Sequence, residues 1–532
     1  MNYLLLLAVL LPLAAALLPS RSAAARWQAL VATLLSLGLA AVLLAHYPAG
    51  NNAFALTDAS WLATAGVPVD IRFSIALDGL SLWLFGLTAV LMVVAVLVSW
   101  KAIQQQQALY YRLLLVLETG MLGVFVARDI ILFYLFFEFT LIPLFFLIGI
   151  WGSEQRRYAA IKFFLFTLAG SVLTLLGLLA IVLWDYTHVS GGRMTFSIAE
   201  LTRHLDQAAA AGHGMDPTLQ LAIFLALFAG FAIKVPLFPL HTWLPLAHTE
   251  APAAGSVILA GVLLKVGSYG FMRFNLPMLP AATAACMPWL LWLAVAGIIY
   301  GALVALAQTD MKRLIAYSSV SHLGFCMLGG FAATRLSVQG GVLQMVNHGL
   351  STGGLFALVG MLYERYHTRQ IADLGGLARQ TPRLAALMVF MALASIGLPG
   401  LNGFVGEFLI LLGMFQRAWT GAPAALASQY RVISALATFG VVLGAWYMLS
   451  LVRRVFFGPL REPDRHAEQP PVRDLGTREL LALAPLVVLI VWIGIHPGFF
   501  LHRMSPTLDQ LTAAVMEKAD ADVFPKPLTP TP

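Results

Sequence analysis

Six titratable side chains stand inside long apolar segments of the sequence, where a charge is costly. A charged side chain at the centre of a bilayer costs about 3 kcal/mol or more, and such residues usually mark functional sites. Buried lysine can release its proton, and histidine changes charge near neutral pH. These residue types therefore predict a path for protons. The six residues are Glu138, Lys234, Lys265, His322, His348 and Glu407.

Each of the six residues falls in a different apolar segment. A cluster within one segment would predict a single binding pocket, whereas one charge per helix predicts a row of groups across the membrane plane. Glu138 and Lys234 are the first pair in this row. Because a nearby carboxylate stabilises a charged ammonium, the distance between them can set how tightly the lysine holds its proton.

Packing roles are the alternative for each of these side chains. Glu138 and Lys234 could form a static ion pair, which is often no more stable than a hydrophobic pair of the same size. Lys265 could extend its ammonium toward the lipid headgroups. His322 and His348 could be hydrogen-bonded packing residues. His241 is a further candidate for the proton path. It comes at the end of a predicted helix, where loop hydrogen bonding is equally expected.

The composition is that of an integral membrane protein. Hydrophobic residues make up 60% of the 532 residues and charged residues only 11%, against roughly 25% charged residues in soluble domains. The basic residues behind the net charge of +7 are scattered among loops, so nucleic acid is not an expected partner. The two cysteines are far apart in the sequence, so they do not predict a metal site. The sequence also has no glycine-rich nucleotide-binding motif that would predict a redox cofactor. We therefore expect no cofactor in this chain.

Long apolar runs divide the chain into helices. A bilayer needs roughly 20 apolar residues per helix, which predicts about fourteen membrane spans and an all-α polytopic fold. The first run lacks a basic stretch ahead of it, so it is predicted to be a span and not a signal peptide. The predicted spans are 3–18, 27–46, 79–99, 112–127, 130–150, 161–184, 219–240, 254–274, 285–307, 313–333, 338–363, 384–415, 432–456 and 479–501.

The spans form one predicted membrane domain, residues 1–532, with a polar tail at 502–532. Loops after odd-numbered spans carry most of the lysines and arginines, so the positive-inside rule places both termini on the outer side. The polar stretches are too short to form a separate catalytic domain. The longest between two spans are 47–78, 185–218 and 457–478.

Two of the predicted spans are interrupted. Pro236 and Pro239 break the seventh span, and the sequence GLPGLNG at 397–403 breaks the twelfth. Paired broken helices in corresponding positions are typical of transporters built from repeats. The second break comes five spans after the first, and this odd offset predicts two inverted five-helix repeats, at 112–274 and 285–456. A broken helix frees backbone groups for water, which suits the lysine beside the first break.

Three motifs carry a resemblance to a known family. They are HTWLPLAHTEAPAAGSVILAGVLLKVGSYG at 241–270, LIAYSSVSHLG at 314–324 and GLPGLNGFVGEF at 397–408. These motifs resemble signatures of the proton-conducting, antiporter-like membrane subunits of respiratory complex I, an NADH:quinone oxidoreductase. The resemblance covers about residues 75–460 and implies fourteen helices with two inverted five-helix repeats.

The resemblance also implies a role for each member of the row. Glu138 and Lys234 are similar to the family's fifth-helix glutamate and broken-helix lysine. Lys265 is similar to its bridging lysine, and Glu407 to its terminal glutamate, which is thought to exchange protons with the outer side. The remaining two, His322 and His348, are similar to the family's axial histidines.

The family implies partners and cofactors outside this chain. We expect other membrane subunits of complex I, of the L and N types, and the lipid bilayer as partners, in a bacterial inner membrane. NADH, flavin, iron–sulfur clusters and quinone would bind in other subunits. The alternative is a subunit of a multisubunit cation (Na⁺)/proton antiporter, and a packing scaffold is a third. Glu407 argues against the antiporter alternative, because the antiporter subunits generally resemble the L and N types of complex I in carrying lysine at this position.

Overall fold

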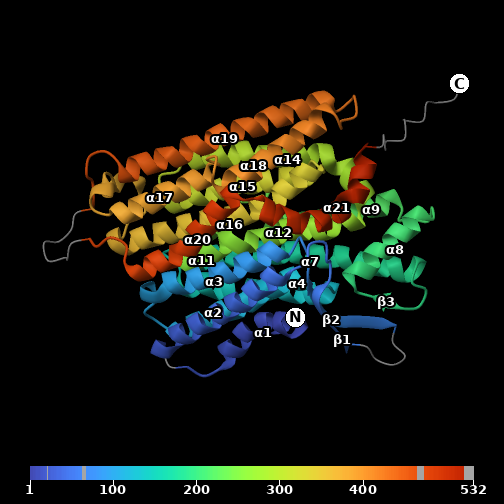
Figure 1. The fold of residues 1–532 in the computed structure, drawn as a ribbon, viewed down its shortest axis with the longest axis horizontal. Coiled ribbons are helices and arrows are strands. Elements are labelled where there is room, and N and C mark those ends of the chain that lie inside the picture. The colour runs from blue at the N-terminus through green and yellow to red at the C-terminus, as the bar shows by residue number, and fades with distance from the viewer. Residues whose placement is uncertain (21, 63–67, 464–471, 521–532) are drawn as a thin grey trace.

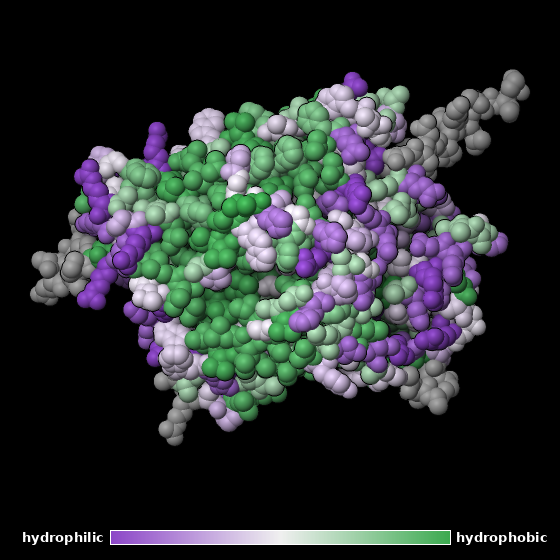
Figure 2. Space-filling view, in the orientation of Figure 1, coloured by the Kyte–Doolittle hydropathy of each residue, from purple (hydrophilic) through white to green (hydrophobic). Residues whose placement is uncertain are grey.

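The computed structural model describes residues 1–20, 22–62, 68–463 and 472–520. Helices dominate it, and most of the long ones run along the longest axis of the molecule (Figure 1). Twelve helices in this part of the chain are long and apolar enough to cross a membrane. Apolar side chains cover the middle of the visible face, while hydrophilic ones gather toward its two ends (Figure 2). The predicted class, a helical multi-pass membrane protein, is confirmed.

The first half of the chain holds the helices α1 (Asn2–Leu17), α2 (Ser22–His46), α3 (Leu82–Ala102), α4 (Gln107–Val126), α5 (Ile130–Phe139), α6 (Leu141–Trp151), α7 (Arg156–His188), α8 (Ile198–Ala210), α9 (Pro217–Lys234), α10 (Trp243–Glu250), α11 (Ala253–Ile258), η1 (Leu259–Leu263), α12 (Leu264–Gly270), η2 (Phe271–Asn275) and α13 (Leu276–Met278). The second half holds α14 (Pro280–Leu306), α15 (Met311–Phe331), α16 (Arg335–Tyr366), η3 (Ile371–Asp373), η4 (Leu377–Arg379), α17 (Pro382–Ser395), α18 (Asn402–Trp419), α19 (Ala427–Phe456), α20 (Thr477–Ile495) and α21 (Gly498–Asp520). Helices α1–α4 lie along one side of the molecule and α14–α19 along the other (Figure 1).

Each of the fourteen predicted spans falls on a helix or a helix pair. Two helices in this set, α1 and α17, are shorter than a full crossing, so the count of fourteen stays a prediction. The predicted span 130–150 is divided at Thr140 into α5 and α6. Pro143 has no N–H to donate to the preceding turn, which weakens the helix at this point.

The predicted breaks occur where the prolines and glycines stand. Helix α9 ends at Lys234, the chain turns through Pro236 and Pro239, and α10 begins at Trp243. Helix α17 ends at Ser395, and α18 begins at Asn402. Gly397 and Gly400 in the second break have φ of 73° and 92°, values that glycine adopts without strain. Each break therefore lies near a residue of the predicted row, the first beside Lys234 and the second shortly before Glu407.

The eighth span, Ala253–Met278, is wholly buried in the window that identifies it. It is helical throughout but contains two π-helical stretches, η1 and η2. Such stretches occur often at functional sites, because they widen the helix and shift the side chains that follow. Lys265 lies two residues after η1, at the start of α12.

A small sheet is an addition that the all-α expectation did not include. Strands β1 (Phe54–Leu62) and β2 (Val69–Leu77) pair antiparallel, and β3 (Met194–Thr195) pairs parallel with β2. The sheet lies in the stretches predicted as polar loops. Alternating apolar and polar residues in Ile71–Leu77 were the available signal, because a half-buried strand has period two.

Two helices lie where only polar loop or tail was expected. Helix α8 forms in the 185–218 loop, with Ser197 accepting a hydrogen bond from the Glu200 backbone N–H as its cap. Helix α21 covers residues 498–520, so the first part of the predicted tail is helical. It packs against α13, α14 and α16. The remaining predicted tail, 521–532, lies outside the described residues.

Candidate functional site

Four of the six predicted residues lie next to one another in a buried row. The Lys265 Nζ lies 2.6 Å from His348 Nδ1, and the rings of His348 and His322 have centroids 5.8 Å apart. The His322 Nδ1 lies 3.2 Å from Glu407 Oε1. None of the four is more than 6% exposed. The row thus runs from α12 through α16 and α15 to α18, with each member supplied by a different helix.

Close helix packing sets the first contact of the row. A Cβ atom added at Gly349 would lie 2.8 Å from the carbonyl oxygen of Gly261, so α16 approaches η1 backbone to backbone. Small residues permit such approaches between membrane helices. His348 precedes Gly349 and is thereby brought against Lys265, whose ammonium also donates to the Ala260 carbonyl. The row depends on glycine at this crossing.

Polar side chains that the sequence analysis missed hold the far end of the row. Gln344 donates to Glu407 Oε1 at 3.1 Å. The Ser395 and Tyr447 hydroxyls each lie 3.3 Å from His322 Nε2. The signal available for Gln344 was its place one helical turn before His348. Nothing in the sequence marks Ser395 and Tyr447, because they reach the row from separate helices.

The first pair of the row is arranged differently. Lys234 is 4% exposed and is the last residue of α9. Its ammonium lies 4.5 Å from the centroid of the Phe137 ring, a cation–π contact. Glu138 is only half-buried and acts on Lys234 through its charge. Within the described ranges no hydrogen bond or ion pair joins Lys234 to Glu138 or to Lys265.

His241 lies apart from the row. It is 3% exposed, and its ring centroid is 5.1 Å from that of Tyr300 and 5.9 Å from that of Phe238. No recorded contact joins it to the six row residues in the part of the chain that the structure describes. The structure thus brings together four of the seven candidates and leaves Glu138, Lys234 and His241 outside that contact.

Two further buried features escaped the sequence analysis. Glu118 in α4 is fully buried, and neither carboxylate oxygen has a hydrogen-bond partner in the part of the chain that the structure describes. Asp78 lies 2.9 Å from Arg128 Nη1 and 2.7 Å from Arg273 Nη2, near the start of α3. Burial alone would raise the pKa of Asp78, but the two arginines hold it below its ordinary value. This second cluster is an ion-pair anchor outside the row.

Metal ligands are not grouped in the described ranges. No three histidine, cysteine, aspartate or glutamate side chains lie together as a metal site would need. Cys286 and Cys326 are buried and unpaired with each other.

Comparison with known proteins defines the class. Residues 127–434 match the family described as NADH:quinone oxidoreductase/Mrp antiporter, TM. A chain of respiratory complex I from Thermus thermophilus with bound NADH has a TM-score of 0.82 at 34% identity, covering 96% of this chain and 99% of that one. A chain of the Mrp complex from Dietzia sp. has a TM-score of 0.75 at 23% identity, covering 97% of this chain and 52% of that one; this likeness shows the fold alone. The fold is that of an antiporter-like membrane subunit.

Curated relatives narrow this class. NADH-quinone oxidoreductase subunit M of Rhodobacter capsulatus is 41% identical over 522 residues, 96% of each chain. Subunit M of Escherichia coli K12 is 42% identical over 463 residues, 86% of this chain and 84% of that protein. The chain belongs to the NADH-quinone oxidoreductase subunit M family. The predicted resemblance to complex I subunits is confirmed and is favoured over the antiporter alternative.

Proposed function

We propose that the chain is a proton-translocating membrane-arm subunit of an NADH:quinone oxidoreductase, with the buried row as its proton path. The observation that carries this proposal is the buried series Lys265–His348–His322–Glu407, with hydrogen-bond distances at its two ends and a ring-to-ring distance of 5.8 Å between the histidines. Subunits of the L and N types are its membrane partners. NADH, flavin, iron–sulfur clusters and quinone bind in other subunits. Electron transfer in those subunits drives the changes of charge along the row in this chain.

Proton transfer along the row follows from its contacts. Lys265 can pass a proton from Nζ to His348 Nδ1 across 2.6 Å. The His348 and His322 rings have two nitrogens each, so a proton accepted at one nitrogen can leave from the other. His322 Nδ1 then faces Glu407 Oε1 at 3.2 Å. Two adjacent positive charges repel strongly in a buried site, so a proton arriving at one end favours release at the other.

The separate pair, Glu138 and Lys234, would act as the switch. An ion pair at about 4 Å gains roughly 4 kcal/mol at an effective dielectric of 20. Moving one charge across 100 mV costs about 2.3 kcal/mol. Opening or closing this pair therefore changes the lysine's hold on its proton by enough to move a charge against the membrane potential. The break after Lys234 gives the lysine freedom to move.

The proposed setting is a bacterial inner membrane with both termini on the outer side. The supporting observation is the excess of arginine and lysine on the opposite loops, which include Arg156, Arg157 and Arg313. In this orientation Glu407 would exchange protons with the outer side.

Proton pumping in two variants tests the proposal. Glu138→Ala and Lys234→Ala would be placed in the whole complex in sealed inverted membranes, and acidification would be followed during NADH oxidation. Assembly of each complex is checked first, because removing a buried charge can destabilise a protein. We expect pumping to be lost or strongly weakened with the complex intact. Full pumping in both variants would contradict the assigned roles.

A further inference from the structure

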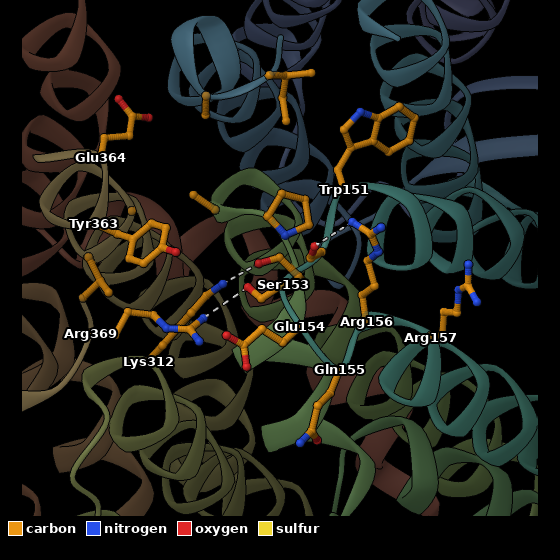
Figure 3. Close-up of a pocket in the computed structure, with 18 of the residues that line it drawn as sticks. Trp151, Ser153, Glu154, Gln155, Arg156, Arg157, Lys312, Tyr363, Glu364 and Arg369 are labelled. Atoms are coloured by element: carbon orange, nitrogen blue, oxygen red, sulfur yellow. Dashed lines mark hydrogen bonds between the residues drawn. The ribbon is translucent and has the colours of Figure 1, made fainter. Parts of the chain in front are cut away.

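A cavity of about 970 Å³ opens on the face that carries Arg156 and Arg157. Its walls come from the α6–α7 connection, the α10–α11 connection, α15 and α16. Figure 3 shows Trp151 and Arg156 on one side of this space and Lys312, Tyr363 and Arg369 on the other. A cavity of this size with charged walls holds many waters, so it can deliver protons to any buried group on its inner wall.

Lys312 is the buried base on this inner wall. It is 6% exposed, and its ammonium donates to the Ala251 carbonyl. The nearby anions are Asp310 and Glu250, but both have other partners. Arg369 Nε lies 3.3 Å from Asp310 Oδ2, and the Gln155 backbone N–H donates to Glu250 Oε2 at 2.9 Å. No salt bridge within the described residues ties Lys312 to a carboxylate.

His248 lies three residues before Ala251, whose carbonyl accepts the hydrogen bond from the Lys312 ammonium. It is fully buried, and among the described residues neither of its ring nitrogens has a hydrogen-bond partner. Its ring stacks on Phe356 with centroids 4.5 Å apart and planes 5° apart. Leaving a buried polar group without a hydrogen-bond partner carries an energetic cost. Stacking alone therefore does not explain a histidine at this position, because phenylalanine would stack without that cost.

The charges of two lysines act on the His248 ring. The positive charges of Lys312 and Lys265 are both within electrostatic range of it, and His248 in turn acts on His348. Helix α10, which carries His248, packs against α15, which carries Lys312. The stacking partner of His248, Phe356, lies about one helical turn before Gly360 of the cavity wall and about two turns after His348 of the row, all on α16.

We propose that Lys312 and His248 form the proton entrance of the row, leading from the cavity to Lys265. A proton taken from cavity water by the Lys312 amine passes to one ring nitrogen of His248. The opposite nitrogen releases a proton to the Lys265 amine through a bridging water, and the ring returns to its neutral form. One proton enters and one leaves at each residue. This inference rests on the proposed function and identifies where protons enter the row.

His248→Phe is the decisive variant. It keeps a flat ring on Phe356 but removes both nitrogens, so it separates a relay from a packing role. In the assembled complex we expect the rate of NADH-driven proton pumping to fall about tenfold or more, since positioned proton donors and acceptors typically contribute 10²–10⁴-fold. A purely structural role predicts unchanged pumping. Where His248→Phe does not assemble, His248→Ala decides, and addition of imidazole should restore its pumping.

Lys312 supplies a second test with a matched control. Lys312→Arg keeps the positive charge but cannot release a proton at neutral pH. We expect it to pump as poorly as Lys312→Met, whereas Lys101→Ala, an exposed lysine at the end of α3, should pump normally. Normal pumping in His248→Phe and Lys312→Arg, with Lys234→Ala defective, would overturn the entrance alone. Normal pumping in Lys234→Ala as well would overturn the proposed function.

Discussion

The two buried lysines of the proposed path have different surroundings. Lys265 lies in a continuous helix, 2.6 Å from the next proton carrier. Lys234 ends a broken helix, rests over the Phe137 ring and meets its carboxylate, Glu138, only through long-range attraction. The difference indicates two tasks. Contact at hydrogen-bond distance suits transfer of a proton, whereas separated charges beside a helix break suit a switch that moves.

Replacement of Lys265, the lysine in direct contact with a proton carrier, should reduce proton pumping more than any other change. Lys265→Ala removes the group that both receives the entering proton and contacts His348, and no described neighbour can take its place. We expect the pumping rate of the assembled complex to fall about 100-fold, within the range for lost proton-transfer groups. The measurement is acidification of sealed inverted vesicles per unit of assembled complex. Pumping within a factor of two of wild type would contradict a transfer role.

Shortening the two carboxylates should separate contact from long-range attraction. Glu407→Asp withdraws the carboxylate from His322 and Gln344, which hold it at 3.2 and 3.1 Å, so pumping should fall about tenfold. Glu138→Asp moves a charge that acts at a distance, and pumping should change by only about twofold. The two variants are compared in the same vesicle assay. Equal losses would show that both carboxylates work in the same way.

Asp78→Asn should reduce stability without touching the row. It leaves buried Arg273 without its carboxylate, and breaking a buried ion pair typically costs about 3–5 kcal/mol. Thermal unfolding of the purified complex, followed by the loss of this subunit, gives the measurement. Protons pumped per NADH by the surviving complex should equal the wild-type value. A change in that ratio would mean that this cluster belongs to the proton path.

The smallest expected effect is a pH dependence at Asp129, the N-cap of α5. Burial raises the pKa of Asp129 to about 6, above the usual value near 3.9 for an unfolded chain. Its contribution to stability is thus fully present below about pH 4 and is lost as the pH rises through about 6. Asp129→Asn keeps a capping side chain and removes this titration. The stability of wild type relative to Asp129→Asn should therefore fall between pH 4 and 7, and parallel pH curves would contradict the assignment.

The sequence predicted the helical class and the row of titratable groups because both follow from the cost of charge in an apolar segment. Lys265, His348, His322 and Glu407 meet as a row because their helices pack closely. That Lys234 makes no hydrogen bond or ion pair with Glu138 or Lys265 in the described ranges could not be predicted, since its position depends on how the chain turns after Pro236. Gln344 and Tyr447 were missed for a related reason: ordinary polar residues gain a role only from the helices that face them.

The most direct measurement is a high-resolution map of the assembled complex during turnover, inspected between Lys234 and Lys265. The account predicts ordered waters or polar side chains that connect the two ammonium groups in at least one state, and connect Glu407 to the outer side in another. Dry aliphatic packing between the two lysines in every state would contradict a proton path that spans both halves of the chain.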